Sequence, residues 1–391
     1  MIYLRSRLKL AHLGVVLLLM LTTQSSSSLQ VPGLYEHRVV VANESDAERN
    51  RAFREALEAV LLKVTGDRRW LSAPVIQQAI SNAQSYVEAI SYSSEATEVS
   101  TDAVDPEQGE QMIGDQQEND VASLNDSQTR GIRETRYINV NFAQSLLDDL
   151  LAGADIPVWD SNRPSVLVWM ALQNNEGERS MATADSNPEI ISFMQKFAAE
   201  RGLPIIFPVL DFEDRRALTE DAVWALDEDV IRRASERYGA DSVLSGRLHF
   251  TVSGELVGLW QFIFQGQAEV FDGFDEELET YLDEPLDRIT NQLASHFALI
   301  PEATNQQIVR IQVEGIRDLS AYSALLNYIS SLGLVESVIT TAFEGQLLEL
   351  QLGLLGNTQQ LFELIALDRD LLPVTNSQLL NESALTYRWT R

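Results

Sequence analysis

The chain has 391 residues, a hydrophobic content of 45%, a charged content of 22% and a formal net charge of −29. This length exceeds one ordinary domain, and the composition is that of a globular protein with buried cores. The acidic balance disfavours nucleic acid and anionic membranes as partners, because both are bound through lysine and arginine. The sequence contains no cysteine, which excludes disulfides, thiol nucleophiles, thiolate metal sites and the lipid-bearing cysteine of bacterial lipoproteins.

The first residues have the layout of a secretory signal peptide. Arg5, Arg7 and Lys9 precede an uncharged apolar core over residues 13–21, and small polar residues follow. The core is shorter than the roughly 20 residues that a membrane-spanning helix needs. We therefore predict a cleaved signal peptide over residues 1–28 and a periplasmic location, with no stable membrane span after processing. The alternative is an uncleaved N-terminal segment that anchors the chain in the inner membrane.

A first α/β domain is predicted over residues 30–160. Ser45 and Glu48 form a capping box at the start of a long helix. Gly66 stands where a left-handed C-terminal cap belongs, so the helix is expected to end there. A second helical pattern runs from Ala73 to about Ile90.

The composition changes sharply inside this first domain. Residues 94–129 contain ten acidic residues, no basic residue and no aromatic residue. Such a segment cannot bury enough apolar area to offset its ordering entropy, so a disordered acidic insertion is predicted. Weak binding of a divalent cation is the alternative interpretation, although no calcium-loop spacing supports it. The alternation of Ile138, Val140 and Phe142 then indicates a strand, and a helix follows that ends at Gly153.

A second α/β domain with a mixed sheet is predicted over residues 163–300. It begins with the continuous apolar strand RPSVLVWMAL and a helix that is capped by Asn187 and Gly202. A further strand, PIIFPVL, is followed by a helix from Asp221 to Tyr238. Antiparallel strands with a turn at Ser253–Gly254 come next.

The closing helix of this second domain is predicted to begin at Pro285. A third domain is predicted over residues 306–391. It starts with a strand and a helix capped by Asp318, continues with a hairpin turning at Glu344–Gly345, and ends with a helix and a strand. This order, β-α-β-β-α-β, is the ferredoxin-like motif. The fold class is therefore α/β and α+β, with tandem small mixed-sheet modules of which the last is ferredoxin-like.

The familiar catalytic and cofactor motifs are absent from the sequence. It contains no His-Glu-x-x-His, no Gly-x-x-x-x-Gly-Lys, no Gly-x-Gly-x-x-Gly and no Gly-x-Ser-x-Gly. We predict no cofactor and no metal site, the catalytic residues are unknown, and the balance leans against an enzyme. His249, on the polar face of its strand, and the carboxylates of Asp211–Asp214 are the weak candidates for a catalytic site.

One group of basic and aromatic residues is kept as a predicted interaction patch. Arg68, Arg69 and Trp70 follow the end of the first long helix, and Arg163 lies near Trp159 in the sequence. Paired guanidinium groups beside an indole suit an anionic partner or a protein interface. The alternative is that these arginines form ordinary surface salt bridges.

Four segments, in this order, resemble a family of secreted proteobacterial proteins catalogued as a domain of unknown function, DUF 2066. They are RAFREALEAVLLKVTG, IPVWDSNRPSVLVWMAL, RYGADSVLSGRL and VEGIRDLSAYSALLNYISSLGLVESV. The resemblance implies an exported protein of a Gram-negative bacterium and brings no known activity. The middle segment, with GADSVLSGRLHF, is also similar to the N-terminal domain of TolB-type periplasmic proteins and to lipoprotein activators of peptidoglycan synthases.

The predicted function is that of a non-enzymatic envelope protein that binds other proteins or cell-wall polymer. The first alternative is a hydrolase that acts on cell-wall or outer-membrane material. The second is a divalent-cation binder that uses the acidic insertion.

Overall fold

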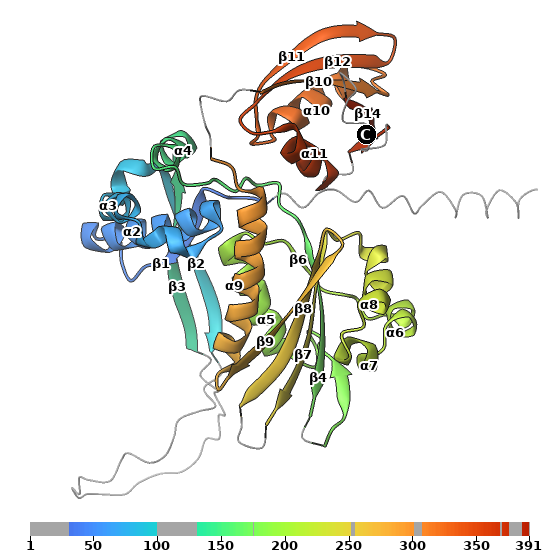
Figure 1. Cartoon of the computed structure of the whole chain (residues 1–391). Helices are drawn as coiled ribbons and strands as arrows, with labels where there is room; N and C mark the ends of the chain where they lie inside the picture. The colour runs from blue at the N-terminus through green and yellow to red at the C-terminus, as the bar shows by residue number, and fades with distance from the viewer. Residues whose placement is uncertain are drawn as a thin grey trace, which may run out of the picture. The chain divides into compact units, whose positions relative to one another are not determined.

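The computed structural model describes residues 31–99, 131–174, 176–251, 255–300, 307–367, 370–374 and 385–390. The predicted signal peptide and most of the predicted acidic insertion lie outside these residues. The described residues divide into two compact units, one over residues 33–156 and the other over residues 157–391 together with Val31 and Pro32. The predicted fold class is confirmed, because each unit is built from small sheets and helices (Figure 1).

The unit over residues 33–156 contains a three-stranded antiparallel sheet in the order β1-β3-β2. Its strands are β1 (Glu36–Val40), β2 (Val87–Val99) and β3 (Gly131–Phe142), and its α-helices are α2 (Asp46–Thr65), α3 (Pro74–Ser81) and α4 (Gln144–Ala152). The caps of α2 are as predicted: Ser45 accepts from the backbone N–H of Glu48, and Gly66 is left-handed with φ 71°. Lys63, in the last turn, donates to the carbonyls of Gly33 and Glu36.

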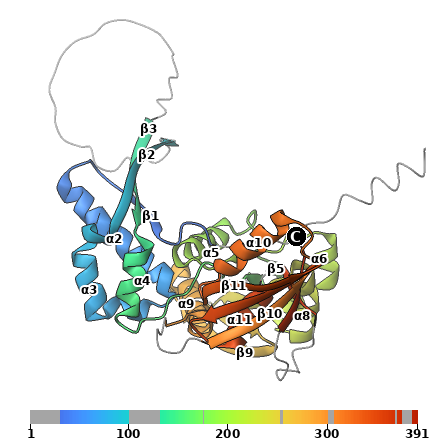
Figure 2. The same ribbon diagram turned by 90° about the horizontal axis from the view of Figure 1, so that it is seen from above.

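Two predictions for this unit are wrong. The helical pattern from Ala73 ends at Ser81, and after a short 3-10 turn the chain enters β2 at Val87. Residues 94–99, placed in the disordered insertion, pair with residues 131–136 of β3 (Figure 2). The reason is non-local, because the strand that pairs with this segment lies more than thirty residues further along the chain.

The unit over residues 157–391 begins with a mixed sheet in the order β5-β4-β7-β8-β9, with β6 also paired to β4. Its strands are β4 (Val166–Gln173), β5 (Arg179–Met181), β6 (Ile205–Ile206), β7 (Ser242–Phe250), β8 (Leu256–Phe264) and β9 (Gln267–Asp275). β4 runs parallel to both β6 and β7, and β7, β8 and β9 form an antiparallel meander. The predicted turn between β7 and β8 lies outside the described residues.

Helices cover both faces of this sheet (Figure 1). The helices α5 (Pro188–Arg201) and α9 (Leu278–Phe297) pack on one face around Trp260, Leu244 and Phe262. The short helices α6 (Phe212–Ala217), α7 (Glu220–Trp224) and α8 (Glu228–Ser235) pack on the other face, around Trp169. The continuous apolar run of β4 is therefore explained by burial on both faces.

Two helix predictions in this sheet module need correction. The predicted helix from Asp221 to Tyr238 is divided into α7, α8 and a 3-10 turn, because Leu226 adopts a left-handed φ of 53° and Asp227 caps a new helix. The closing helix begins at Leu278, so Pro285 lies inside it. Tyr281 and Leu282 are buried one turn before the proline, and their burial offsets the backbone hydrogen bond that a proline loses.

The C-terminal module of the same unit has the predicted β-α-β-β-α-β order with one added strand. It contains β10 (Gln307–Glu314), α10 (Leu319–Ser330), β11 (Val335–Glu344), β12 (Leu347–Leu354), α11 (Thr358–Leu367), β13 (Leu371–Pro373) and β14 (Leu385–Trp389). The sheet order is β11-β12-β10-β14-β13. β14 runs parallel to β10, because the short β13 turns the chain before β14 enters the sheet.

Candidate functional site

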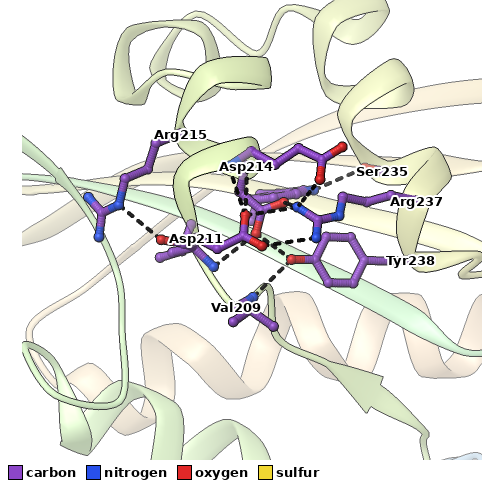
Figure 3. Close-up of polar contacts among 10 residues, drawn as sticks. Val209, Asp211, Asp214, Arg215, Ser235, Arg237 and Tyr238 are labelled. Carbon is purple, nitrogen blue, oxygen red and sulfur yellow. Dashed lines mark hydrogen bonds and ion pairs between the residues drawn. The ribbon is translucent and has the colours of Figure 1, made fainter. Parts of the chain in front are cut away.

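A polar network fixes the chain where β6 leads into α6 (Figure 3). Its members are Asp211, Asp214, Arg237 and Tyr238, which we call the Asp214 network. The carboxylate of Asp214 is 1% exposed and accepts from the backbone N–H of Leu210, the Tyr238 hydroxyl and Nη1 of Arg237, the last at 2.7 Å. Asp211 accepts from both terminal nitrogens of Arg237, at 2.9 and 3.0 Å.

The network holds a short loop in an unusual conformation. Leu210 has a positive φ of 54°, and the Tyr238 hydroxyl accepts from the backbone N–H of Val209. Val209 and Phe212 are thereby left 76% and 81% exposed. Burial and the hydrogen bond to Asp214 raise the pKa of Tyr238 to about 12. The carboxylates predicted as hydrolase candidates are thus engaged by donors that shape this loop.

The ion pair at Asp211 predicts a pH-dependent contribution to stability. Hydrogen bonding to Arg237 lowers the pKa of Asp211 from 3.8 to about 2 in the folded chain. The pair therefore stabilises the fold above the unfolded pKa and loses this effect as the pH falls towards 2. We expect Asp211→Asn to lower the melting temperature at pH 6, and the difference from the native chain to vanish near pH 2. Asp185→Asn, at an exposed position outside the network, is the matched control; equal behaviour of both variants would contradict the assignment.

His249 lies in an aromatic and cationic cluster around Trp224, at the end of β7. Its ring centre is 6.0 Å from that of Trp224, and the guanidinium groups of Arg179 and Arg247 lie 4.6 and 5.5 Å from the same ring. Arg179 also pairs with Asp221 at 2.7 Å, and Arg247 donates to the carbonyl of Trp224. These contacts account for His249 as a packing residue, and no carboxylate in the described part of the chain hydrogen-bonds it as a base would require.

A small pocket lies at the carboxyl ends of β4 and β7. β6 and β7 flank β4 on opposite sides, and the connecting helices cover opposite faces, so this end of the sheet is a topological switch point where small ligands commonly bind. The pocket has a volume of about 340 Å³ and is lined by Gln173, the first turn of α5, Leu248 and Leu278, among others. The hydroxyl of its Ser186 lies against Thr183 and Asn187, which are not bases.

The predicted interaction patch has an exposed part in the unit over residues 33–156. Arg68 and Arg69 are exposed and Trp70 is half-buried, at the start of a short 3-10 turn after α2. Arg69 pairs with Asp67 at 2.7 Å, and its guanidinium lies 5.1 Å from the Trp70 ring. Asp67 also accepts from the backbone N–H of Arg69. An interaction role for these three residues stays a prediction.

Arg163 belongs to the other unit and is 2% exposed. Its guanidinium donates to the carbonyls of Trp159, Asp160, Arg201 and Gly202, at distances between 2.6 and 3.1 Å. It also lies 4.2 Å from the ring of Trp159. Two of these carbonyls are at the C-terminal end of α5, where the helix dipole favours a cation. The contacts explain Arg163 by folding alone.

An apolar surface on β8 and β9 was missed by the sequence reasoning. Residues that face one another across an antiparallel pair lie on the same face of the sheet. By this register Val257 stands beside Phe274, and Leu259 beside Asp272. Val270 and Phe274 are 54% and 75% exposed, and Val257 and Leu259 are half-buried. We call Val257, Leu259, Val270 and Phe274 the bare face. The alternation of Val270 and Phe274 with buried Phe271 and Gly273 is the sequence pattern that could have revealed it.

Within the described ranges, no three His, Asp or Glu side chains are grouped so that they could hold a metal ion. None of the helices that the structure describes is long and apolar enough to cross a membrane.

Residues 28–160 match the model of a family described as a domain of unknown function, DUF8605. This number differs from that of the DUF 2066 family named above, so that resemblance is not confirmed for this region. The match supports an uncharacterised family for about the first third of the chain. No curated protein matches the chain.

Three solved structures share low similarity with the chain. Lipoprotein GNA1162 from Neisseria meningitidis is 12% identical over 34% of this chain and 99% of its own, with a TM-score of 0.20. A competence-damaged protein (CinA) superfamily protein from Enterobacter cloacae is 9% identical over 39% of this chain and 88% of its own, with a TM-score of 0.20. An uncharacterized protein is 10% identical over 34% of this chain and 98% of its own, with a TM-score of 0.16. Likenesses at these scores carry no argument about function.

Proposed function

We propose that the chain is an exported, non-enzymatic protein of the Gram-negative cell envelope that binds other proteins. The pattern of residues 1–28 and the resemblance to secreted proteobacterial and TolB-type proteins support the location. The bare face is the single observation that carries the binding role. Clustered apolar side chains on the surface of a soluble protein are characteristic of interaction sites.

The bare face differs from an ordinary scatter of exposed apolar residues. Phe274 and Val270 stand on the same face of β9 with Asp272 between them. Phe274 lies opposite half-buried Val257 of β8, and Asp272 lies opposite half-buried Leu259. The neighbouring rows add Arg247 and His249, which lie against Trp224. Apolar and aromatic side chains with an arginine nearby are residues that protein interfaces favour.

Site-specific photo-crosslinking in living cells tests this proposal. We expect a photoreactive residue at position 274 to form a discrete, reproducible protein adduct in the periplasmic fraction. A probe at Lys196, an exposed position on α5 whose side chain is 74% exposed, is the matched control and should form none. Equal labelling at the two positions, or recovery of an unprocessed chain from the cytoplasm, would contradict the proposed function.

A further inference from the structure

β9 is an edge strand whose backbone is open to pairing. No strand in the described part of the chain pairs with its outer side. All nine residues, Gln267–Asp275, pair with β8 in an unbroken register. An edge of this kind presents a row of backbone donors and acceptors to any extended chain that approaches it.

Several features that commonly protect an edge strand are missing from β9, although it carries acidic side chains. It contains no proline, no lysine and no bulge, and its exposed residues include Val270 and Phe274. β11, the edge strand of the C-terminal sheet, is interrupted by two register shifts. β2 has one register shift, and β5 and β13 have three residues each. Among the described edge strands, β9 is therefore the longest that is in register with its neighbour over its whole length; β1 has five residues, and β2 is in register only after its shift at Val87.

Charge at the edge selects the kind of partner. Asp272 lies between Val270 and Phe274 on the bare face, is exposed, and forms no hydrogen bond or ion pair with a described residue. Asp275, Glu276 and Glu277 follow directly in the sequence. In a pairing of two copies, the register that sets Phe274 against Val270 also sets Asp272 against Asp272, which is destabilising. A strand with a cation at that position would be stabilised instead.

We propose that β9 binds an extended segment of a partner protein as an added strand, with the pattern apolar-x-basic-x-apolar. The apolar residues would continue the bare face beside Phe274 and Val270, and the basic residue would pair with Asp272. Main-chain hydrogen bonds to the β9 edge supply affinity, and the two apolar side chains and the basic side chain of the partner segment supply specificity. This proposal rests on the proposed function, since it names the binding mode of the same surface.

Synthetic peptides with the full chain test the proposal. The parent peptide is Lys-Val-Thr-Lys-Thr-Val-Lys, and its charge control has glutamate in place of each lysine. Two further peptides carry N-methyl groups on alternate backbone amides, one peptide on the odd-numbered amides and the other on the even-numbered amides. Each keeps the charges of the parent peptide but can no longer donate hydrogen bonds from one of its two edges. Fluorescence anisotropy measures affinity, and amide hydrogen exchange reports on residues 267–275.

We expect the parent peptide to bind at least about tenfold more tightly than the acidic peptide and to slow exchange in β9. One of the two methylated peptides should lose about tenfold in affinity, and Asp272→Lys should reverse the charge preference. Phe274→Ser should weaken binding of the parent peptide. Equal binding of the parent and both methylated peptides would overturn strand addition and leave charge attraction alone. Dimerisation of the chain that Phe274→Ser abolishes would also overturn it, by assigning β9 to a second copy.

The two proposals fail separately. If position 274 forms an adduct in cells but both methylated peptides bind as tightly as the parent, the proposed function is supported and strand addition is contradicted. If peptide binding depends on the backbone amides but position 274 forms no adduct in cells, strand addition at β9 is supported and the proposed function is contradicted.

Discussion

Replacement of Asp214 with asparagine is expected to destabilise the unit over residues 157–391 by about 2–3 kcal/mol, the usual loss when a buried, hydrogen-bonded carboxylate can no longer accept from all its donors. Three donors converge on the Asp214 carboxylate: the Leu210 N–H, the Tyr238 hydroxyl and the Arg237 guanidinium. Asparagine has one acceptor oxygen and must turn an NH₂ group towards at least one of these donors. The residual Arg237 charge would also lose a partner that is almost fully buried.

Native-state hydrogen exchange is the suitable measurement, because it assigns the loss of stability to particular strands in a chain with two units. We expect faster exchange in β4 and β7 and at the Leu210 amide, with the unit over residues 33–156 unchanged. Tyr238→Phe is the graded control, because it removes one hydrogen bond and should cost about 1–2 kcal/mol. An Asp214→Asn chain as stable as the native one would show that the network does not hold the loop.

The sequence predicted the features whose causes are local. Ser45, Gly66, Asn187, Gly202 and Asp318 are helix ends in the structure, because a cap acts on the neighbouring turn alone. The α/β character and the three sheet modules were predicted from the same local signals. The parallel pairing of β14 with β10 and the two register shifts of β11 were not, since strand pairing depends on residues far apart in the chain.

The candidate site was predicted less well, for the same reason. Asp211–Asp214 were noticed as an acidic cluster, but Arg237 and Tyr238, more than twenty residues later, decide what that cluster does. His249 was interpreted from the residues of its own strand, but its aromatic neighbour Trp224 comes from α7, a helix that covers the sheet. The bare face is recognised only from the register of β8 with β9, which makes Val257 and Phe274 neighbours. Side-chain chemistry is visible in a sequence, but its partners are set by the fold.

Arg163 shows how far the surroundings of one residue can reverse an interpretation. A guanidinium near an indole was predicted to be an interaction patch, yet this one donates to four backbone carbonyls and is buried. We expect Arg163→Met to destabilise the unit over residues 157–391 by on the order of 4 kcal/mol, because several buried acceptors lose a charged donor while the volume of the stem is kept. Arg163→Lys should recover only part of this loss, since an ammonium cannot span the same acceptors.

Arg69→Met supplies the matched comparison, because Arg69 was assigned to the same predicted patch but its side chain is 66% exposed. Because Arg69 pairs with the mostly buried Asp67, this variant should lose up to about 1 kcal/mol, and only in the unit over residues 33–156. The two variants therefore separate the roles of the two arginines in one measurement. Hydrogen exchange at the last turn of α5, whose carbonyls accept from Arg163, should rise in Arg163→Met alone. Unchanged protection there would mean that the buried guanidinium does not stabilise the helix end, and that packing against Trp159 holds this corner of the fold.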